Sequence, residues 1–234
     1  MKKYNVFVHI VSNCVIVALL FGLYLACVPS PDTPAYAPIY KGDGNSGKVA
    51  LMFNVYQGSE YVEGIMVVME KYDATCTFFV GGCWAEKNMT LLKSMSEKYE
   101  IGNHGYLHLD HAAISEQSNR EEIGLCGTLI EKVTGKTPTL FAPPSGSIGN
   151  AMTKVCAELG YKIIMWSKDT IDWRDKDYEL VYKRATSDIQ SGDLVLMHPT
   201  AHTLKALPTI LDYYAANGLS TATVSEILTE EGSY

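Results

Sequence analysis

The chain has 234 residues, of which 47% are hydrophobic and 19% charged, and its formal net charge is −7. An acidic chain lacks the basic surface that contacts phosphate, so nucleic-acid binders are excluded as a class. A chain this apolar can bury a sizeable core, which excludes a disordered protein and favours one domain with short extensions.

The N-terminal residues form an apolar leader. Lys2 and Lys3 precede residues 14–28, which carry no charged group. That run suits the hydrophobic region of a signal peptide, whereas residues 4–28 are long enough to serve as a membrane anchor if uncleaved. Residues 1–28 therefore predict a signal peptide or an N-terminal anchor. Either one places the domain outside the cell or on the outer face of the membrane, with a net charge of −9 once both lysines are set aside.

The leader is followed by a stretch rich in proline and glycine. Proline removes hydrogen-bond donors and glycine resists ordering, so residues 29–47 predict a linker and residues 48–230 the single domain. The domain contains Cys76, Cys83, Cys126 and Cys156 within apolar patterns. No CxxC pair occurs, which disfavours a structural zinc site, and buried free thiols are favoured over disulfides that export would permit.

From Lys48 onward, β-rich apolar runs alternate with helical patterns. Strands are predicted at 49–53, 75–80, 100–103, 139–141, 161–167, 193–197 and 221–224. Helical spacing occupies 61–72, 91–99, 123–133, the residues up to Gly160, 179–190 and 204–214. This alternation implies parallel strands joined by crossover helices, and the apolar strands imply burial on both faces. Six or seven units indicate an α/β barrel, complete or open.

Polar residues follow several of the predicted strands. Asn54, His104, Asp169, Asp172 and His198 each come after an apolar run. The carboxyl ends of strands form the active face of a parallel barrel, so these residues are the first candidates for chemistry.

The histidines in this set allow more than one interpretation. His104 and His108 are four residues apart, which is metal-ligand spacing on a helical turn, although such pairs also arise by chance. His198 ends a strand before Pro199 and could act as a general acid or form a hydrogen bond in the core.

The carboxylates are equally open to two interpretations. Asp169 and Asp172 precede Trp173 and could orient a histidine beside a sugar pocket. The alternative is an Asx turn that caps a helix.

Taken together in this order, the motifs resemble those of the polysaccharide deacetylase (NodB-homology) domain, carbohydrate esterase family 4, and within it the sporulation-type branch of Gram-positive bacteria. The matching stretches are 49–54, 77–82, 100–108, 140–146, 166–173 and 192–198. The resemblance implies a distorted (β/α)7 barrel that removes acetyl groups from N-acetylated glycans, either peptidoglycan or chitin-like polymers. We expect the domain to be a monomer.

The resemblance also implies site residues. His104 and His108 match metal-binding histidines, and the implied cofactor is a divalent metal, in most members zinc. His198 matches the general acid, Asp172 the residue that orients it, and Asp169 stands beside that residue. The expected substrate-binding residues are Trp173, Asn54, Pro143 and Pro144.

Three positions depart from the family pattern. Asn54 replaces the aspartate that serves as catalytic base, Val55 the metal aspartate, and Ala142 the arginine that braces the base. An amide cannot take up a proton at neutral pH, and loss of a positioned base costs roughly 10²–10⁴ in rate. Two hypotheses remain: a metal-assisted hydrolase, in which water, Glu60 or a fourth-motif carboxylate replaces the base, or a glycan-binding pseudoenzyme. Family membership favours the first.

Overall fold

The structure is a computed structural model that describes residues 37–228. The predicted signal peptide or anchor at residues 1–28 lies outside the described residues. Within residues 37–228, no helix has both the length and the apolar character needed to cross a membrane.

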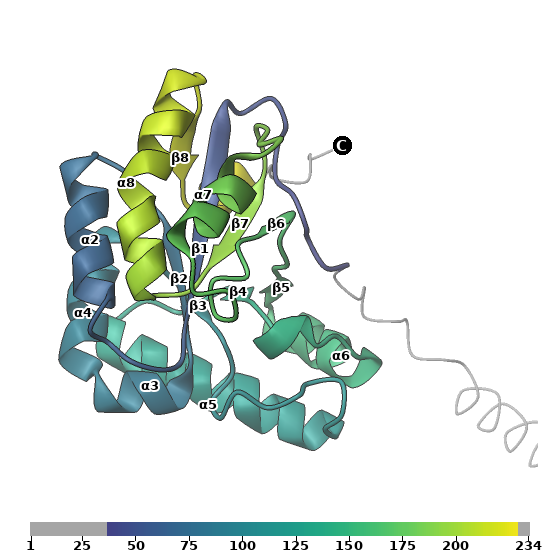
Figure 1. The fold of residues 1–234 in the computed structure, drawn as a ribbon. Coiled ribbons are helices and arrows are strands. Elements are labelled where there is room, and N and C mark those ends of the chain that lie inside the picture. Colours follow the sequence, from purple (N-terminus) through teal and green to yellow (C-terminus); the bar gives the residue numbers. More distant parts are fainter. Residues whose placement is uncertain (1–36, 229–234) are drawn as a thin grey trace, which may run out of the picture. The chain divides into compact units, whose positions relative to one another are not determined.

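A curled parallel sheet organises the domain (Figure 1). Its strands are β1 (Lys48–Val55), β2 (Thr77–Val80), β3 (Glu100–Asn103), β4 (Leu140–Phe141), β5 (Lys162–Ile163), β6 (Lys168–Asp169), β7 (Leu194–Met197) and β8 (Ser220–Ala222). Their order is β5-β4-β3-β2-β1-β7-β6, and β8 also pairs with β1. Every strand pair is parallel. The predicted α/β architecture is thus confirmed.

Helices connect the strands and most of them lie on one face of the sheet (Figure 1), whereas Val224 and Ile227 of the last helix pack on the opposite face with Ala50 and Met52. They are α2 (Val62–Lys71), α3 (Gly82–Lys87), α4 (Met89–Lys98), α5 (Glu116–Thr134), α6 (Asn150–Leu159), α7 (Tyr178–Thr186), α8 (Ala201–Ala216) and α9 (Val224–Ile227), with a 3₁₀ turn at Pro144–Gly146. Helices α5 and α6 end at Gly135 and Gly160, which adopt φ values of 77° and 74°. Glycine adopts this left-handed conformation without a steric penalty, so both act as helix stops.

The side chains of β1 alternate between two separate parts of the core. Leu51, Phe53 and Val55 pack on the helix side of the sheet, whereas Ala50 and Met52 pack on its inner side. Successive side chains of a strand point to opposite faces. Asn54 therefore continues the inner side of the sheet, at the carboxyl end of the strand.

Two predicted strands have different limits in the structure. The run 161–167 contains only the short strand β5, while Ile164 after it forms an isolated bridge to Ile39, and β6 begins one residue beyond the predicted end. The run 221–224 stops at Ala222, since Thr223 caps α9: its side chain accepts the Glu226 N–H, and the Glu226 carboxylate accepts the Thr223 N–H. This reciprocal capping box is a stable helix start.

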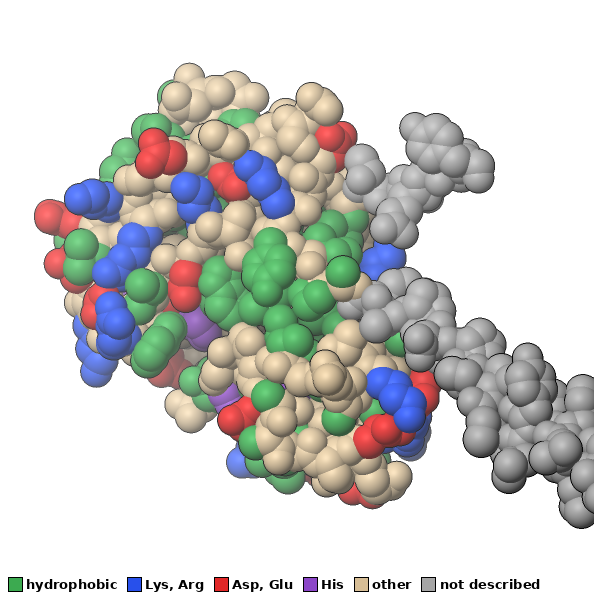
Figure 2. All heavy atoms as spheres, turned by 90° about the vertical axis from the view of Figure 1, so that its right-hand side faces the viewer, with side chains coloured by type: hydrophobic (Ala, Val, Ile, Leu, Met, Phe, Trp, Pro, Cys, Tyr) green, Lys and Arg blue, Asp and Glu red, His purple; other side chains and the backbone are tan. Residues whose placement is uncertain are grey.

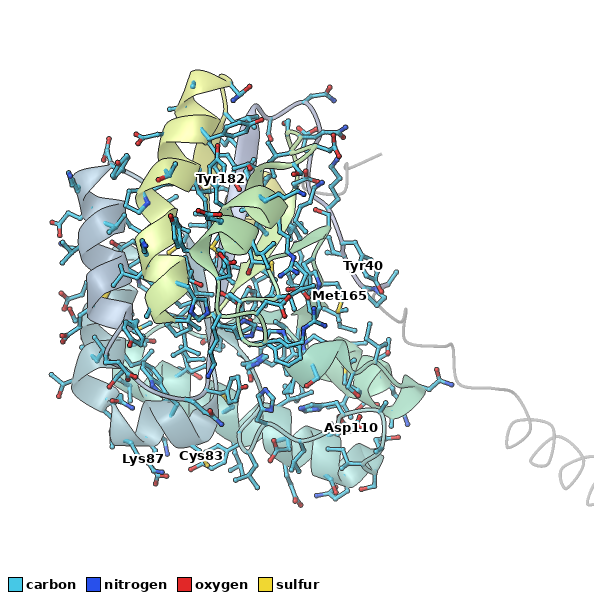
Figure 3. All side chains as sticks on the ribbon, in the orientation of Figure 1. Tyr40, Cys83, Lys87, Asp110, Met165 and Tyr182 are labelled. Carbon is cyan, nitrogen blue, oxygen red and sulfur yellow. The ribbon has the colours of Figure 1, made fainter. Side chains whose placement is uncertain are left out.

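Part of the predicted linker packs against the sheet. Ile39 forms a parallel bridge to Ile164, and Lys41 forms an antiparallel bridge to Asp193. Tyr40 and Met165 both lie at this edge of the domain (Figure 3), and the Met165 N–H donates to the Ile39 carbonyl at 2.8 Å. Residues 39–41 thus connect the β5 edge with β7.

The four cysteines of the described residues are all free thiols. Cys76, Cys126 and Cys156 are buried, and burial raises the pKa of Cys126 and Cys156 to about 12. The expected burial thus holds for three of these four thiols, and Cys83 is half-buried.

Candidate active-site pocket

The inner faces of three strands converge on one cavity at their carboxyl ends. Asn54 ends the inner row of β1, His198 follows Leu194 and Leu196 of β7, and His104 follows β3. The period of two that buries the apolar members of each strand also turns these polar residues inward. The cavity measures about 290 Å³ and is lined by Asn54, Tyr56, His104, His108, Ser145, Trp166, Asp169, Trp173, Leu196 and His198.

The surface around this site is markedly apolar. Figure 2 shows histidine side chains in a hollow beside a continuous apolar area. Trp173 lines the cavity and remains 57% exposed, so much of its ring is available to a ligand. Trp166 provides a second, partly buried aromatic wall. Exposed aromatic rings around a pocket with a few polar groups are typical of a small-molecule site.

Asp172 and His198 form a hydrogen-bonded pair, in which both carboxylate oxygens of Asp172 accept bonds. Asp172 is completely buried, and its Oδ1 accepts the Nδ1–H of His198 at 2.8 Å. Its Oδ2 accepts the backbone N–H of His198 and the hydroxyl of Thr203, both at 2.6 Å. The carboxylate thus fixes the His198 ring and leaves its Nε2 for the cavity.

His104 is held as a neutral imidazole. It is buried, and its Nδ1 lies 2.7 Å from the Ala142 carbonyl, which can only accept. Burial lowers the pKa of His104 to about 3, against the opposing effect of that hydrogen bond. Nδ1 therefore carries the proton, and the lone pair of Nε2 is unprotonated.

His108 lies beside His104, with ring centroids 5.1 Å apart. It adopts a left-handed backbone with φ of 60°. The preceding turn is anchored because Oε2 of Glu122, on α5, accepts the backbone N–H groups of Tyr106 and Leu107 at 3.0 and 2.8 Å. The predicted histidine pair is thus brought together, but on a loop rather than on a helical turn.

Asn54 lines the cavity and has an unsatisfied acceptor. Its side chain is 4% exposed, and its Oδ1 has no hydrogen-bond partner among the described residues. A buried polar atom without a partner costs about 1–3 kcal/mol. A ligand that donates an N–H or O–H to this oxygen would recover that free energy.

The remaining predicted residues differ in their placement. Asp169 lines the cavity, and its Oδ1 accepts the Ile171 N–H at 2.8 Å, which is the Asx turn weighed as the alternative. Pro143 and Pro144 are both buried and do not line the cavity. The expectation that they contact substrate finds no support in this arrangement. Ser145, with φ of 54°, provides the wall at that point.

The metal-ligating side chains of the site do not match a catalytic zinc site, which needs three protein ligands. The described residues contain no group of three or more histidine, cysteine, aspartate or glutamate side chains that could hold a metal ion. Val55, where the family pattern has a metal aspartate, is fully buried in the helix-side core and does not line the cavity. His104 and His108 are thus left without a carboxylate partner.

The sequence did not indicate several residues of the site. Tyr56 follows β1 directly, Ser145 lies in the 3₁₀ turn, Trp166 precedes β6, Leu196 lies within β7, and Glu122 lies in the middle of α5. The position of Tyr56 just after an apolar strand was a usable signal. Nothing in the helical pattern around Glu122 distinguishes it from a solvent-exposed glutamate.

We expect the histidines to make the domain sensitive to acid. The ordinary histidine pKa is about 6.5 in an unfolded chain, and that of folded His104 is about 3. The unfolded state therefore binds more protons below pH 6.5, and stability falls as the pH drops towards 3, by about 1.4 kcal/mol per pH unit for one proton. Burial lowers the pKa of His108 and His111 as well, in the same direction.

Urea unfolding at a series of pH values measures this dependence. The difference in unfolding free energy between wild type and His104→Gln should change by about 1.4 kcal/mol per pH unit, which is the slope for one proton. A wild-type stability that stays constant between pH 6.5 and 4 would contradict the assignment.

The chain is similar in sequence to several known proteins. A family model described as polysaccharide deacetylase matches residues 41–164. The Bacillus subtilis protein YlxY is 35% identical over 82% of this chain. The match covers 61% of the length of YlxY. A Bacillus cereus peptidoglycan-N-acetylglucosamine deacetylase is 32% identical over 79% of this chain and 89% of its own length.

Solved structures give a similar result. BA3943 from Bacillus anthracis, described as a pseudoenzyme of carbohydrate esterase family 4, superimposes with a TM-score of 0.80 at 34% identity, over 83% of this chain and 70% of that chain. A mutant of BA3943, 33% identical to this chain, is described as having restored enzymatic activity. The peptidoglycan N-acetylglucosamine deacetylase Bc1960 superimposes with a TM-score of 0.79 at 27% identity, over 82% of this chain and 93% of that chain. The implied distorted barrel is thereby confirmed.

Proposed function

Because the chain belongs to the polysaccharide deacetylase family, we propose that it binds N-acetylated cell-envelope glycan and does not deacetylate it. Its 61% coverage of YlxY leaves room in that relative for activities outside this domain. The observation that carries the proposal is the Asn54 side chain, buried at the cavity with its oxygen unpartnered. This oxygen accepts a hydrogen bond but takes up no proton at neutral pH.

An acetamido sugar offers a hydrogen-bond donor and a ring face that match the groups lining this cavity. Its N–H can donate to Asn54 Oδ1, and its ring can pack on the exposed face of Trp173. The cavity volume of about 290 Å³ suits one sugar residue. The domain is acidic, so binding to an anionic wall polymer would depend on these shaped contacts rather than on general charge attraction.

A metal-assisted hydrolase is the second candidate. The intact Asp172–His198 pair favours it, because such a pair can supply a proton to a leaving amine. Its general base would have to be found elsewhere. Asp169 is engaged in a turn, and Glu60 lines a neighbouring cavity of about 560 Å³. Zinc is the metal that the resemblance implies, but two histidines alone do not complete its site.

We infer that the domain acts outside the cytoplasm, where peptidoglycan is found. The inference is supported by the apolar leader at residues 1–28. Membrane attachment through residues 4–28, and the monomeric state, stay predictions.

The test measures binding and turnover on the same full-length protein. We expect chitin oligomers or peptidoglycan fragments to quench tryptophan fluorescence, with no release of acetate after addition of zinc or cobalt. Trp173→Ala should weaken binding about ten-fold, since exposed aromatic anchors dominate such contacts. Tyr40→Ala is the matched control, because Tyr40 is 51% exposed and lines neither cavity.

Two outcomes would contradict the proposal. Acetate release that is lost in His198→Ala would favour the hydrolase. Equal binding by wild type and Trp173→Ala would remove the pocket as the binding site.

A further inference from the structure

Tyr56 occupies a distinctive place beside the histidine pair. It follows the last residue of β1, and its ring stacks on His108 with centroids 3.9 Å apart and an angle of 25° between the ring planes. Its centroid lies 6.1 Å from that of His104. The three rings thus form one cluster on the wall of the cavity.

Without a complete set of metal ligands in the described part of the chain, the two histidine rings must be held by other contacts. In a metal centre the ion fixes the orientation of its histidines. Here His104 is fixed by its bond to the Ala142 carbonyl, whereas the His108 ring makes no hydrogen bond to another described residue. The stacked face of Tyr56 lies 3.9 Å from the His108 ring, centroid to centroid, nearer than the edge-on His104 ring at 5.1 Å. Aromatic stacking of this kind is directional.

We propose that Tyr56 takes the structural place of a metal ion in this pocket, orienting His108 and supplying a wall for bound glycan. The glycan part rests on the proposed function. Tyr56 lines both the 290 Å³ cavity and the adjoining 560 Å³ cavity. Asn54, Trp173 and His198 are the other residues that the two cavities share.

The shared wall indicates the class of ligand. A single sugar fills the smaller cavity, and a chain that continues past Tyr56 and Trp173 enters the larger one. The larger cavity also contains Gln57 and Lys176, which offer hydrogen-bond donors. The ligand is therefore an oligosaccharide of two or more residues, and Tyr56 contributes to its length preference.

The first arm of the test needs no glycan. Full-length protein in detergent, with histidine labelled at Cε1, is titrated with zinc and followed by NMR. In wild type we expect the His108 signal to be shifted by the Tyr56 ring and to remain unchanged by equimolar zinc. Tyr56→Ala should lose the ring shift, and Tyr56→Phe should keep it. Zinc that moves the His104 and His108 signals of wild type together at equimolar ratio would overturn the proposal.

The second arm compares ligands of different length. Tyr56→Ala should weaken binding of N-acetylglucosamine tetramer about ten-fold and that of the monosaccharide less, whereas Tyr56→Phe should bind both like wild type. EDTA should leave wild-type binding unchanged. Tetramer binding by Tyr56→Ala at wild-type affinity would overturn the glycan part. If wild type binds no glycan, the proposed function fails, while the imidazole signals still decide whether Tyr56 orients His108.

Discussion

Replacement of Asp172 by alanine is expected to lower the free energy of unfolding by about 3–5 kcal/mol, which is the cost of removing one partner from a buried charged network. The carboxylate is completely buried and accepts three hydrogen bonds, two from His198 and one from Thr203. All three donors lose their partner in the variant. Urea unfolding followed by circular dichroism measures the loss.

Asp172→Asn separates charge from shape at the same position. The amide oxygen can replace Oδ2 and keep the bonds from the His198 N–H and Thr203. The amide nitrogen then faces His198 Nδ1 and donates to it, so the ring must carry its proton on Nε2 instead. We expect a loss of about 1–3 kcal/mol and a changed His198 tautomer, visible in nitrogen chemical shifts. An alanine variant as stable as wild type would contradict the network.

Replacement of Glu122 by alanine is expected to cost about 2–4 kcal/mol and to release the turn before His108. Glu122 is 5% exposed, and its Oε2 alone accepts the backbone N–H groups of Tyr106 and Leu107. Hydrogen bonds to a charged acceptor contribute about 1.5–3 kcal/mol each. The loss should appear both in urea unfolding and in the NMR signal of His108.

Glu122→Gln is the matched control for this effect. Because both N–H groups bind one oxygen, the glutamine carbonyl can replace it without changing the count of bonds. We expect a loss of about 1 kcal/mol, from the weaker neutral acceptor. If the alanine and glutamine variants were equally stable, the turn would not depend on this oxygen.

Much of the site follows from strand periodicity. The inner rows Ala50–Met52–Asn54 and Leu194–Leu196–His198 each end in a polar residue, and a period of two places that residue at the cavity. The same rule turns Val55 to the helix side, away from the cavity. The resemblance to a glycan-active family depended on these residues and was confirmed by comparison.

Other parts of the site could not be predicted because they depend on loops. His108 and Ser145 adopt φ values of 60° and 54°, and no local pattern predicts such a conformation for these residue types. The proline pair at 143–144 was expected in the pocket, whereas Ser145 lies there. A left-handed residue reverses the chain and changes which side chain faces the ligand.

The sequence alone determined the parallel α/β architecture, the place of Asn54 and His198 at the carboxyl ends of strands, and the absence of a base at position 54. These properties depend on residue type and on the regular geometry of strands. Only the tertiary structure decided that Tyr56 stacks on His108, that Glu122 anchors the turn before it, and that Asn54 Oδ1 has no partner among the described residues. Each of these depends on the distance between segments well separated along the chain, which is set by the packing of the whole domain.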